Sequence, residues 1–186
     1  MRIIAGQWRG RKLTFPDVCG LRPTSDRIRE TLFNWLQPVL PGANCLDLFA
    51  GSGALGFEAA SRGAAQVVMV DSARDVVRAL RENTKLLSAP SVQICQQDAA
   101  SYLVTGSGPF DVVFLDPPFT SPELLMRSIT GLSAPGRLAA GARIYIETPS
   151  TVAEPVVPVN WALEKQKMAG QVAYRLYSYR AGSGTP

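Results

Sequence analysis

The chain has 186 residues, of which 46% are hydrophobic and 18% are charged, and its formal net charge is +4. This length and composition are typical of one globular domain. No apolar run approaches the roughly 18 residues of a membrane span, and the first residues lack the apolar core of a signal peptide, so we expect a cytoplasmic protein outside the membrane.

Cysteine and histidine content excludes two further classes of site. Cys19, Cys45 and Cys95 are odd in number, far apart and in no CxxC pair, so neither a disulfide framework nor a zinc site is indicated. The chain has no histidine, which removes the commonest metal ligand and the commonest general base. We therefore expect no metal, and chemistry carried by carboxylates, backbone groups and aromatic rings.

Positive charge is concentrated at the N-terminal end. Residues 1–30 contain seven Lys or Arg against three acids, whereas the rest of the chain contains twelve of each sign. A basic excess confined to one end predicts a polyanionic partner such as a nucleic acid. A merely solvated basic end is the simpler alternative.

Residues 2–15 contain two β-type runs around Gly6 and Gly10, which predict a small hairpin. Trp8 lies among arginines, where its ring can stack on a base, although a place in the core is equally compatible. Further along, Thr24 or Ser25 can cap a helix that ends before Pro38. The apolar positions of that helix recur at helical spacing and are Ile28, Leu32, Trp35 and Leu36.

Six basic residues of this N-terminal region form the predicted RNA-binding set. Cations at a helix start oppose the helix dipole, so helix stability does not account for those near the predicted cap. Contact with phosphates accounts for them better. The set is Arg9, Arg11, Lys12, Arg22, Arg27 and Arg29.

The central motif is residues 44–56, NCLDLFAGSGALG, which predicts a strand, a tight turn and a helix start. Gly51, Gly53 and Gly56 have GxGxxG spacing, which allows a sharp turn and close backbone approach to a nucleotide-like ligand. The spacing alone fits a dinucleotide-binding or a methyl-donor-binding fold. We expect Gly53→Val to block the ligand while leaving the fold intact.

Strand-like and helix-like segments alternate after residue 44, which predicts a doubly wound α/β fold. Expected strands are 44–49, 66–70, 92–96, 111–116 and 142–148, and expected helices are 54–62, 73–87, 98–104 and 122–132. Residues 161–169 and 171–179 predict a terminal antiparallel hairpin. We expect one domain over residues 1–180, with a basic extension at 1–40, and a disordered tail at 181–186.

Asp47 and Asp98, together with the Asp-Pro-Pro-Phe motif at residues 116–119, indicate S-adenosylmethionine as the ligand, whereas Asp71 fits either fold. Asp47 lies inside an apolar strand, where a buried carboxylate needs a partner, a ligand or the amides of the glycine turn. Asp71 can accept both hydroxyls of a ribose, and Asp98 can accept from an adenine amino group or cap a helix. The predicted cofactor-binding set is Asp47, Phe49, Gly51, Gly53, Asp71, Ser72, Asp98 and Ala99.

Residues 116–119, Asp-Pro-Pro-Phe, form the most specific motif. Two prolines fix a rigid turn without amide donors, which leaves the Asp116 carboxylate and the Pro117 carbonyl as acceptors for an amino group. Such acceptors stabilise the positive charge that develops on an amine during methyl transfer, and Phe119 offers a face to an extruded base. A plain turn is the alternative. The predicted catalytic set is Asp116, Pro117, Pro118 and Phe119.

The segments RIIAGQWRGRKL, LRPTSDRIRETLFNWL, DLFAGSGALGFEAASRGA, DPPF and GQVAYRLY resemble the bacterial 16S ribosomal RNA guanine-N2 methyltransferases, which are class I S-adenosylmethionine-dependent enzymes. The resemblance implies a monomer with a Rossmann-like, seven-stranded, mostly parallel sheet and a small N-terminal extension. It implies methylation of one guanine of 16S ribosomal RNA in a protein-bound small-subunit particle. Asp71 departs from the glutamate common at that position.

Other functions fit the motifs when the resemblance is set aside. DPPF equally allows methylation of adenine N6 in DNA or RNA, or of a glutamine amide in a protein. The glycines also fit an NAD-dependent oxidoreductase, although the DPPF turn and the lack of histidine weigh against it. A non-catalytic RNA-binding assembly factor is a further alternative, which the intact acids Asp47, Asp98 and Asp116 disfavour.

Overall fold

The computed structural model describes residues 1–15 and 25–181. The helices are α1 (Asp26–Leu36), α2 (Ala54–Ser61), α3 (Arg74–Leu86), α4 (Ala99–Thr105) and α5 (Pro122–Leu132). The strands are β1 (Asn44–Asp47), β2 (Gln66–Asp71), β3 (Val92–Gln96), β4 (Phe110–Leu115), β5 (Leu138–Pro149), β6 (Trp161–Ala169) and β7 (Val172–Tyr179). Most predicted bounds agree within two residues. Strand β5 starts four residues early, because Leu138 pairs with Phe110 ahead of an irregularity in the register.

All seven strands form one sheet in the order β3-β2-β1-β4-β5-β7-β6. Strands β1 to β5 pair in parallel, and β7 pairs antiparallel with both β5 and β6. The predicted Rossmann-like class I fold with a C-terminal antiparallel hairpin is therefore confirmed. Within the described residues no helix combines the length and apolar character needed to cross a bilayer.

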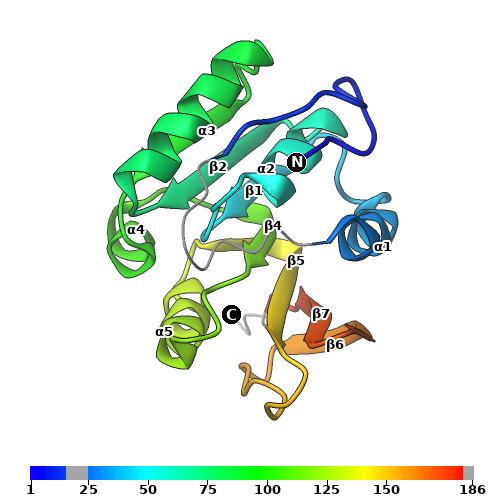
Figure 1. Ribbon diagram of the computed structural model, residues 1–186. Coiled ribbons are helices and arrows are strands. Elements are labelled where there is room, and N and C mark those ends of the chain that lie inside the picture. Colours follow the sequence, from blue (N-terminus) through cyan, green and yellow to red (C-terminus); the bar gives the residue numbers. More distant parts are fainter. Residues whose placement is uncertain (16–24, 182–186) are drawn as a thin grey trace.

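Helices cover both faces of the sheet, as Figure 1 shows. Side chains alternate between the faces of a strand, so Cys45 belongs to one hydrophobic core and Leu46 to the other. The first core lies under α1, α2 and α3, and includes Phe33, Phe57 and Leu80. The second lies under α4 and α5. Burial on both faces accounts for the nearly continuous apolar sequences of β1, β2 and β4.

The N-terminal segment, residues 1–15, forms less β structure than predicted. It doubles back on itself, with Ile3 N donating to Arg11 O at 3.0 Å and Gly10 N donating to Ile3 O at 2.9 Å. Its only β pairing within the described residues is a single bridge between Arg2 and Lys12. Two extended strands do not form because the next amides of the segment bond to side chains of α2 instead. We call residues 1–15 the N-terminal arm.

Helix α2 holds the arm through two side chains. The Glu58 carboxylate accepts from Ile4 N at 2.8 Å and from Ala5 N at 3.0 Å. The Ser61 hydroxyl accepts from Trp8 N at 3.0 Å and donates to Ala5 O at 2.6 Å. Because α2 directly follows the glycine turn, the arm is fixed to the element that shapes the predicted cofactor site.

Helix α1 begins as the sequence predicts. Ser25 caps it by accepting from Ile28 N at 3.3 Å, while the other candidate cap, Thr24, lies outside the described residues. The predicted apolar positions face the core, and Trp35 stacks on Tyr174 with ring centroids 5.5 Å apart. The predicted disordered tail lies outside the described residues apart from Ala181, and the domain limits stay a prediction.

Candidate active site

The predicted acids gather along one edge of the sheet. Asp47 and Asp71 end β1 and β2, while Asp98 and Asp116 follow β3 and β4. These four strands are parallel neighbours in the order β3-β2-β1-β4, so their carboxyl ends meet at one edge, which we call the carboxyl edge. The strand order reverses between β1 and β4. In open α/β sheets ligands bind outside the carboxyl ends of the strands at such a reversal.

The glycine turn between β1 and α2 has the backbone conformations that the motif predicts. Gly51 and Gly53 have φ of 49° and 79°, a region that favours glycine. A Cβ on Gly56 would lie 2.8 Å from Met69 of β2, so this glycine permits close packing of α2 on the sheet. A Cβ on Gly53 would lie 2.6 Å from the Phe57 ring and 2.8 Å from Leu80. The expectation that Gly53→Val leaves folding intact is therefore wrong, because the side chain would enter the core.

Asp47 is buried beneath the glycine turn and is 2% exposed. Its carboxylate accepts from Gly56 N at 3.0 Å. Asp47 therefore caps a backbone amide of the glycine turn and the following helix, which is one of the roles expected from the sequence. Burial, reinforced by the charge of Asp71, raises the pKa of Asp47 to about 7 against the opposing effect of the Gly56 amide. Asp47 therefore changes charge near neutral pH, where a nearby cationic group would favour its ionised form.

Asp71 links the glycine turn to the start of α3. One carboxylate oxygen accepts from Gly51 N at 3.0 Å, and the other accepts from Ala73 N at 2.8 Å. A carboxylate offers about four lone-pair sites, so each oxygen keeps one for a ligand hydroxyl. The carboxylate is half-buried, and Ser72 beside it is exposed.

Asp98 and Ala99 lie at the start of α4, next to the end of β3. Asp98 is the N-cap, and its carboxylate accepts from Ser101 N at 2.9 Å. Hydrogen bonds from Ser101 lower its pKa, so this exposed side chain is an anion at neutral pH. The cap confirms one of the two roles expected for Asp98, and an adenine contact stays a prediction.

The DPPF turn follows β4 directly. Asp116 is half-buried, Pro117 is buried, and Phe119 is 44% exposed, which is unusual for so large an apolar side chain. The Pro118 carbonyl accepts from Ser121 N at 3.0 Å and stabilises the turn into α5. Asp47 is the register partner of Phe114, so Asp116 lies two residues beyond it across the β1/β4 reversal. The DPPF turn and the glycine turn thus follow the same end of two neighbouring strands.

The predicted RNA-binding cations divide into two groups. Arg9, Arg11 and Lys12 are exposed on the arm, and Arg27 is exposed at the start of α1. Arg22 lies outside the described residues. Arg29 is 1% exposed and is a correction to the predicted set, because a buried guanidinium does not reach a phosphate of a bound RNA.

Arg29 serves the packing of α1 instead. Its Nη2 donates to Arg2 O at 2.9 Å and to the Asp26 carboxylate at 2.6 Å, and its Nη1 faces Glu58 at 3.6 Å. The sequence position of Arg29 gave no sign of this role, since the acid that it faces is 29 residues away in a different helix.

Comparison with known proteins shows the family. The family model described as "Conserved hypothetical protein 95" matches residues 1–178. Over 181 residues the chain is 51% identical to "Ribosomal RNA small subunit methyltransferase D" of Escherichia coli (strain K12), covering 97% of this chain and 91% of that protein. The protein of the same name from Haemophilus influenzae is 46% identical over 182 residues, covering 95% and 93%. The chain belongs to this family of class I methyltransferases.

Solved structures of the family share the fold. A structure titled "Putative methyltransferase yhhF from Escherichia coli" superimposes with a TM-score of 0.89 at 51% identity, and covers 97% of this chain and 98% of that chain. A structure titled as putative methylase HI0767 from Haemophilus influenzae gives a TM-score of 0.82 at 41% identity, with 97% and 98% covered.

The methyltransferase site has donors and acceptors that suit S-adenosylmethionine. Asp71 keeps acceptor sites for ribose hydroxyls, and Asp98 is an exposed anion next to the Ala99 amide. Asp47 is a buried acid with a raised pKa, so a neighbouring cation would stabilise its ionised form. Phe49 is half-buried in the same turn. Within the described residues no group of three or more His, Cys, Asp or Glu could hold a metal ion.

Two residues beside the DPPF turn of this methyltransferase were missed from the sequence. Glu147 is 4% exposed near the end of β5, and the Tyr145 hydroxyl donates to its carboxylate at 2.6 Å. Burial, with the charges of Glu147 and Asp116 adding to it, raises the pKa of Tyr145 well above the ordinary value, so its hydroxyl stays protonated. An acid inside the apolar run ARIYIET was the available signal, of the same kind as Asp47.

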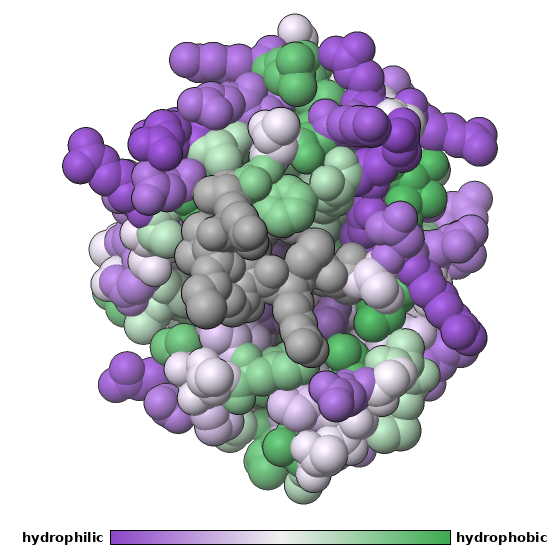
Figure 2. Space-filling model, in the orientation of Figure 1, coloured by the Kyte–Doolittle hydropathy of each residue, from purple (hydrophilic) through white to green (hydrophobic). Residues whose placement is uncertain are grey.

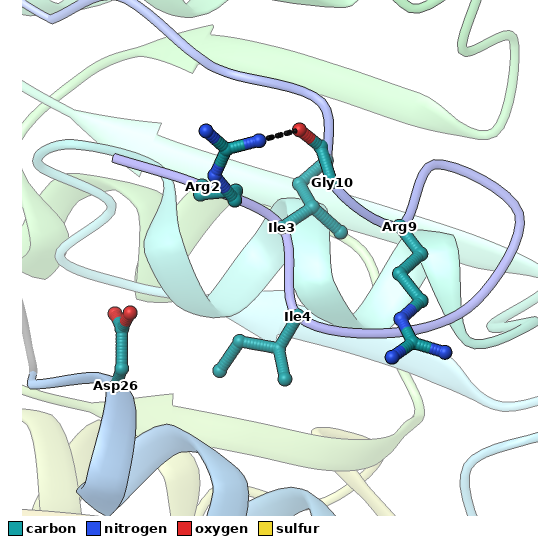
Figure 3. A pocket seen from close by; sticks show the side chains of 6 residues that line it. All are labelled: Arg2, Ile3, Ile4, Arg9, Gly10 and Asp26. Atoms are coloured by element: carbon teal, nitrogen blue, oxygen red, sulfur yellow. Dashed lines mark hydrogen bonds between the residues drawn. The ribbon is translucent and has the colours of Figure 1, made fainter.

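The arm of this methyltransferase also carries a shallow hollow, drawn in Figure 3. It is lined by Arg2, Ile3, Ile4, Arg9, Gly10 and Asp26. Arg2 donates to Gly10 O at 2.6 Å, and Ile4 lies between Asp26 and Arg9 in this view. Apolar side chains next to exposed guanidiniums suit the sugar and phosphate of a nucleotide.

Proposed function

We propose that this protein methylates the exocyclic N2 of one guanine in 16S ribosomal RNA, using S-adenosylmethionine. The substrate in this proposal is a protein-bound particle of the small ribosomal subunit, and the enzyme acts as a cytoplasmic monomer. Family membership supports methyl transfer to ribosomal RNA, because the relatives at 51% and 46% identity are named ribosomal RNA small subunit methyltransferases. The basic arm supports an RNA substrate independently.

The observation that carries the proposal is the position of the DPPF turn relative to the glycine turn. The two turns follow the same end of neighbouring parallel strands, β1 and β4, where the strand order reverses. A cofactor held by the glycine turn and a base held by the DPPF turn therefore lie next to each other. This arrangement supports a single site for the donor and the acceptor of a methyl group, which is the main requirement for group transfer.

The residues of the carboxyl edge hold the cofactor in this proposal. Asp71 accepts the ribose hydroxyls, Asp98 and the Ala99 amide bind the adenine, and Ser72 lies beside the ring. Gly51 and Gly53 let the backbone approach the methionine portion, above Asp47. When bound, S-adenosylmethionine supplies an electrophilic methyl group attached to a sulfonium.

The DPPF turn prepares the acceptor amine. The exocyclic amine of guanine is a poor nucleophile because its lone pair is delocalised into the ring. The Asp116 carboxylate and the Pro117 carbonyl accept hydrogen bonds from the amine, favour its pyramidal form and stabilise the positive charge that develops on it. The exposed ring of Phe119 stacks on the extruded base, while Pro118 keeps the turn rigid.

Two other functions fit the same turn. An adenine-N6 methyltransferase of DNA or RNA would use Asp116 in the same way, because adenine also carries a conjugated exocyclic amine. A non-catalytic RNA-binding assembly factor would keep the basic arm without turnover. Mapping methylated nucleotides by mass spectrometry, in ribosomal RNA from cells with and without the gene, separates the three. An N2-methylguanine of 16S RNA that disappears with the gene supports the proposal, and any other result overturns it.

The roles of the acids are tested by two measurements on each variant, the cofactor dissociation constant and the single-turnover rate. Asp116→Ala should keep cofactor affinity and slow methylation by about 100-fold or more, the scale of removing one transition-state hydrogen bond. Asp116→Asn should be milder, since its amide oxygen still accepts. Asp71→Ala should weaken cofactor binding first and recover rate at saturating cofactor. An Asp116→Ala variant that is fully active, or inactive only because the cofactor no longer binds, overturns the assignment.

A further inference from the structure

Helix α3 carries four cations on one face. Residues are about 100° apart around a helix axis, so positions 74, 78, 81 and 85 fall within an arc of about 60°. All four side chains are exposed, whereas the opposite face of the helix buries Val76 and Leu80 in the first core. We call this set the α3 stripe, and its members are Arg74, Arg78, Arg81 and Lys85.

Helix stability accounts for only one member of the stripe, because Lys85 lies in the last turn of α3, where a cation is favoured by the helix dipole. Arg74 is the first residue of α3, where a cation opposes the helix dipole. Arg78 pairs with Asp75 at 2.9 Å, but both side chains are about two-thirds exposed, and such a pair contributes little. Among the described residues Arg74, Arg81 and Lys85 form no ion pair.

Hydrogen bonds join helix α3, which carries the stripe, to the basic arm. Thr14 and Asn83 of α3 exchange two hydrogen bonds, of 3.3 Å and 2.6 Å, and Asn83 is 1% exposed. Arg11 of the arm donates to Leu86 O, the last residue of α3, at 3.3 Å. Figure 2 shows hydrophilic side chains at the upper left, where Figure 1 places α3, and also along the upper right of the molecule. Cations that are far apart in the sequence thus share one side of the molecule.

The stripe also has a defined position relative to the site. Helix α3 begins three residues after Asp71, so Arg74 lies next to the carboxyl edge. Lys85 lies about 16 Å further along the axis, at about 1.5 Å per residue. The cations recur about once per turn, a spacing comparable to that of successive phosphates in a nucleic-acid strand. The stripe therefore leads from the site along the side of the molecule.

We propose that the α3 stripe binds the phosphate backbone of the ribosomal RNA substrate, as a second contact surface beside the arm. This inference rests on the proposed function, because it takes the substrate to be RNA. A row of four exposed cations, of which Arg74, Arg81 and Lys85 form no ion pair among the described residues, fits a polyanion. A row that begins at the carboxyl edge guides the strand leaving the target base. Phosphate contacts of this kind position the RNA and do not read its sequence.

The test uses the full chain and in vitro transcribed 16S ribosomal RNA as the probe. The triple variant Arg78→Gln/Arg81→Gln/Lys85→Gln leaves Arg74 unchanged, because Arg74 is close to the cofactor residues. We expect the slope of log affinity against log salt to fall by about 2, at roughly 0.7 per lost phosphate contact with single-stranded RNA. Cofactor affinity should not change.

A charge-matched control separates a specific surface from a general effect of charge. Arg127, Lys165 and Lys167 are exposed on α5 and β6, and changing all three to glutamine removes the same charge. We expect this control to keep the salt slope of the parent. If the stripe variant has the same salt slope as the parent, the inference is overturned. It is also overturned if the salt slope falls equally in the stripe variant and in the control. A parent that binds neither the transcript nor the assembled small subunit overturns the proposed function as well.

An acidic protein partner is the other occupant that this surface would suit. The stripe variant would then bind naked 16S RNA as the parent does, and only its binding to the assembled small subunit would weaken. That outcome overturns the RNA assignment of the stripe while leaving the proposed methylation in place, because the parent would still methylate its target guanine.

Discussion

Arg29 of α1 and Glu58 of α2 face each other in the interior, with 3.6 Å between Nη1 and Oε2 and side chains that are 1% and 0% exposed. The same Glu58 carboxylate accepts from the amides of Ile4 and Ala5, and from Arg62 Nε at 2.7 Å. One buried acid thus joins the arm, α1 and α2. The arm that is proposed to bind RNA is therefore held in place by the buried carboxylate of Glu58.

Replacing Arg29 should lower the unfolding free energy of the protein and should have no direct effect on RNA binding. Arg29→Ala leaves the buried Glu58 carboxylate with one cation fewer, and removing one partner of a buried ion pair costs about 3 kcal/mol or more. Arg27→Ala is the matched control, since Arg27 is exposed two residues earlier on the same helix. We expect Arg27→Ala to lower RNA affinity at nearly unchanged stability. Urea unfolding and RNA titration of both variants check this, and the opposite pattern would restore Arg29 to the RNA-binding set.

Gly53→Ala should destabilise the fold even without a ligand. The added Cβ would lie 2.6 Å from the Phe57 ring, and the residue has φ of 79°. Gly136 is a suitable control, because it has the same φ of 79° and nothing within 4 Å of an added Cβ. Gly136→Ala therefore measures backbone strain alone, on the order of 1 kcal/mol. We expect Gly53→Ala to cost about 1–3 kcal/mol more, from overpacking. Equal unfolding free energies of the two variants would show that the core accommodates the methyl group.

Asp47 should make stability depend on pH between about 4 and 7. Its pKa rises from an ordinary value of about 3.9 when unfolded to about 7 when folded, so the folded protein binds the extra proton in this range. The contribution of Asp47 to stability is then greatest below about pH 4 and is lost as the pH rises to about 7, by up to about 4 kcal/mol. Asp47→Asn lacks this titration and can still accept from Gly56. The unfolding free energy of the variant should therefore rise relative to that of the parent as the pH rises. A difference between the two that is the same at every pH would contradict the raised pKa.

Phe119→Ala should slow methylation without loss of stability. The ring is 44% exposed, so little packing is lost, whereas a base–aromatic stack contributes about 1–3 kcal/mol. We expect a fall in single-turnover efficiency of roughly 10- to 100-fold. Phe119→Tyr keeps the ring and should retain most of the activity. If the alanine variant equals the parent in methylation of small-subunit particles, the ring does not contact the base.

The order and type of the elements were largely determined by local sequence. Helix α5 was predicted at its observed bounds, and the strands after residue 44 were placed within two residues except at the start of β5. Each of these segments has strong apolar periodicity between turn residues. The carboxyl-edge acids were also found from sequence, because in a parallel sheet the residues that follow the strands must gather at one edge.

What the sequence left open depended on contacts between segments far apart in the chain. The predicted hairpin is a single bridge because Glu58, more than fifty residues away, takes up the amides of the arm. Arg29 was taken for a surface cation, since only the packing of α1 against α2 shows that it is buried. Gly53 was explained by a ligand, whereas Phe57 and Leu80 already fill the space beside it. Local patterns specify periodicity and turns, but burial and charge pairing are decided only when the packed layers bring distant side chains together.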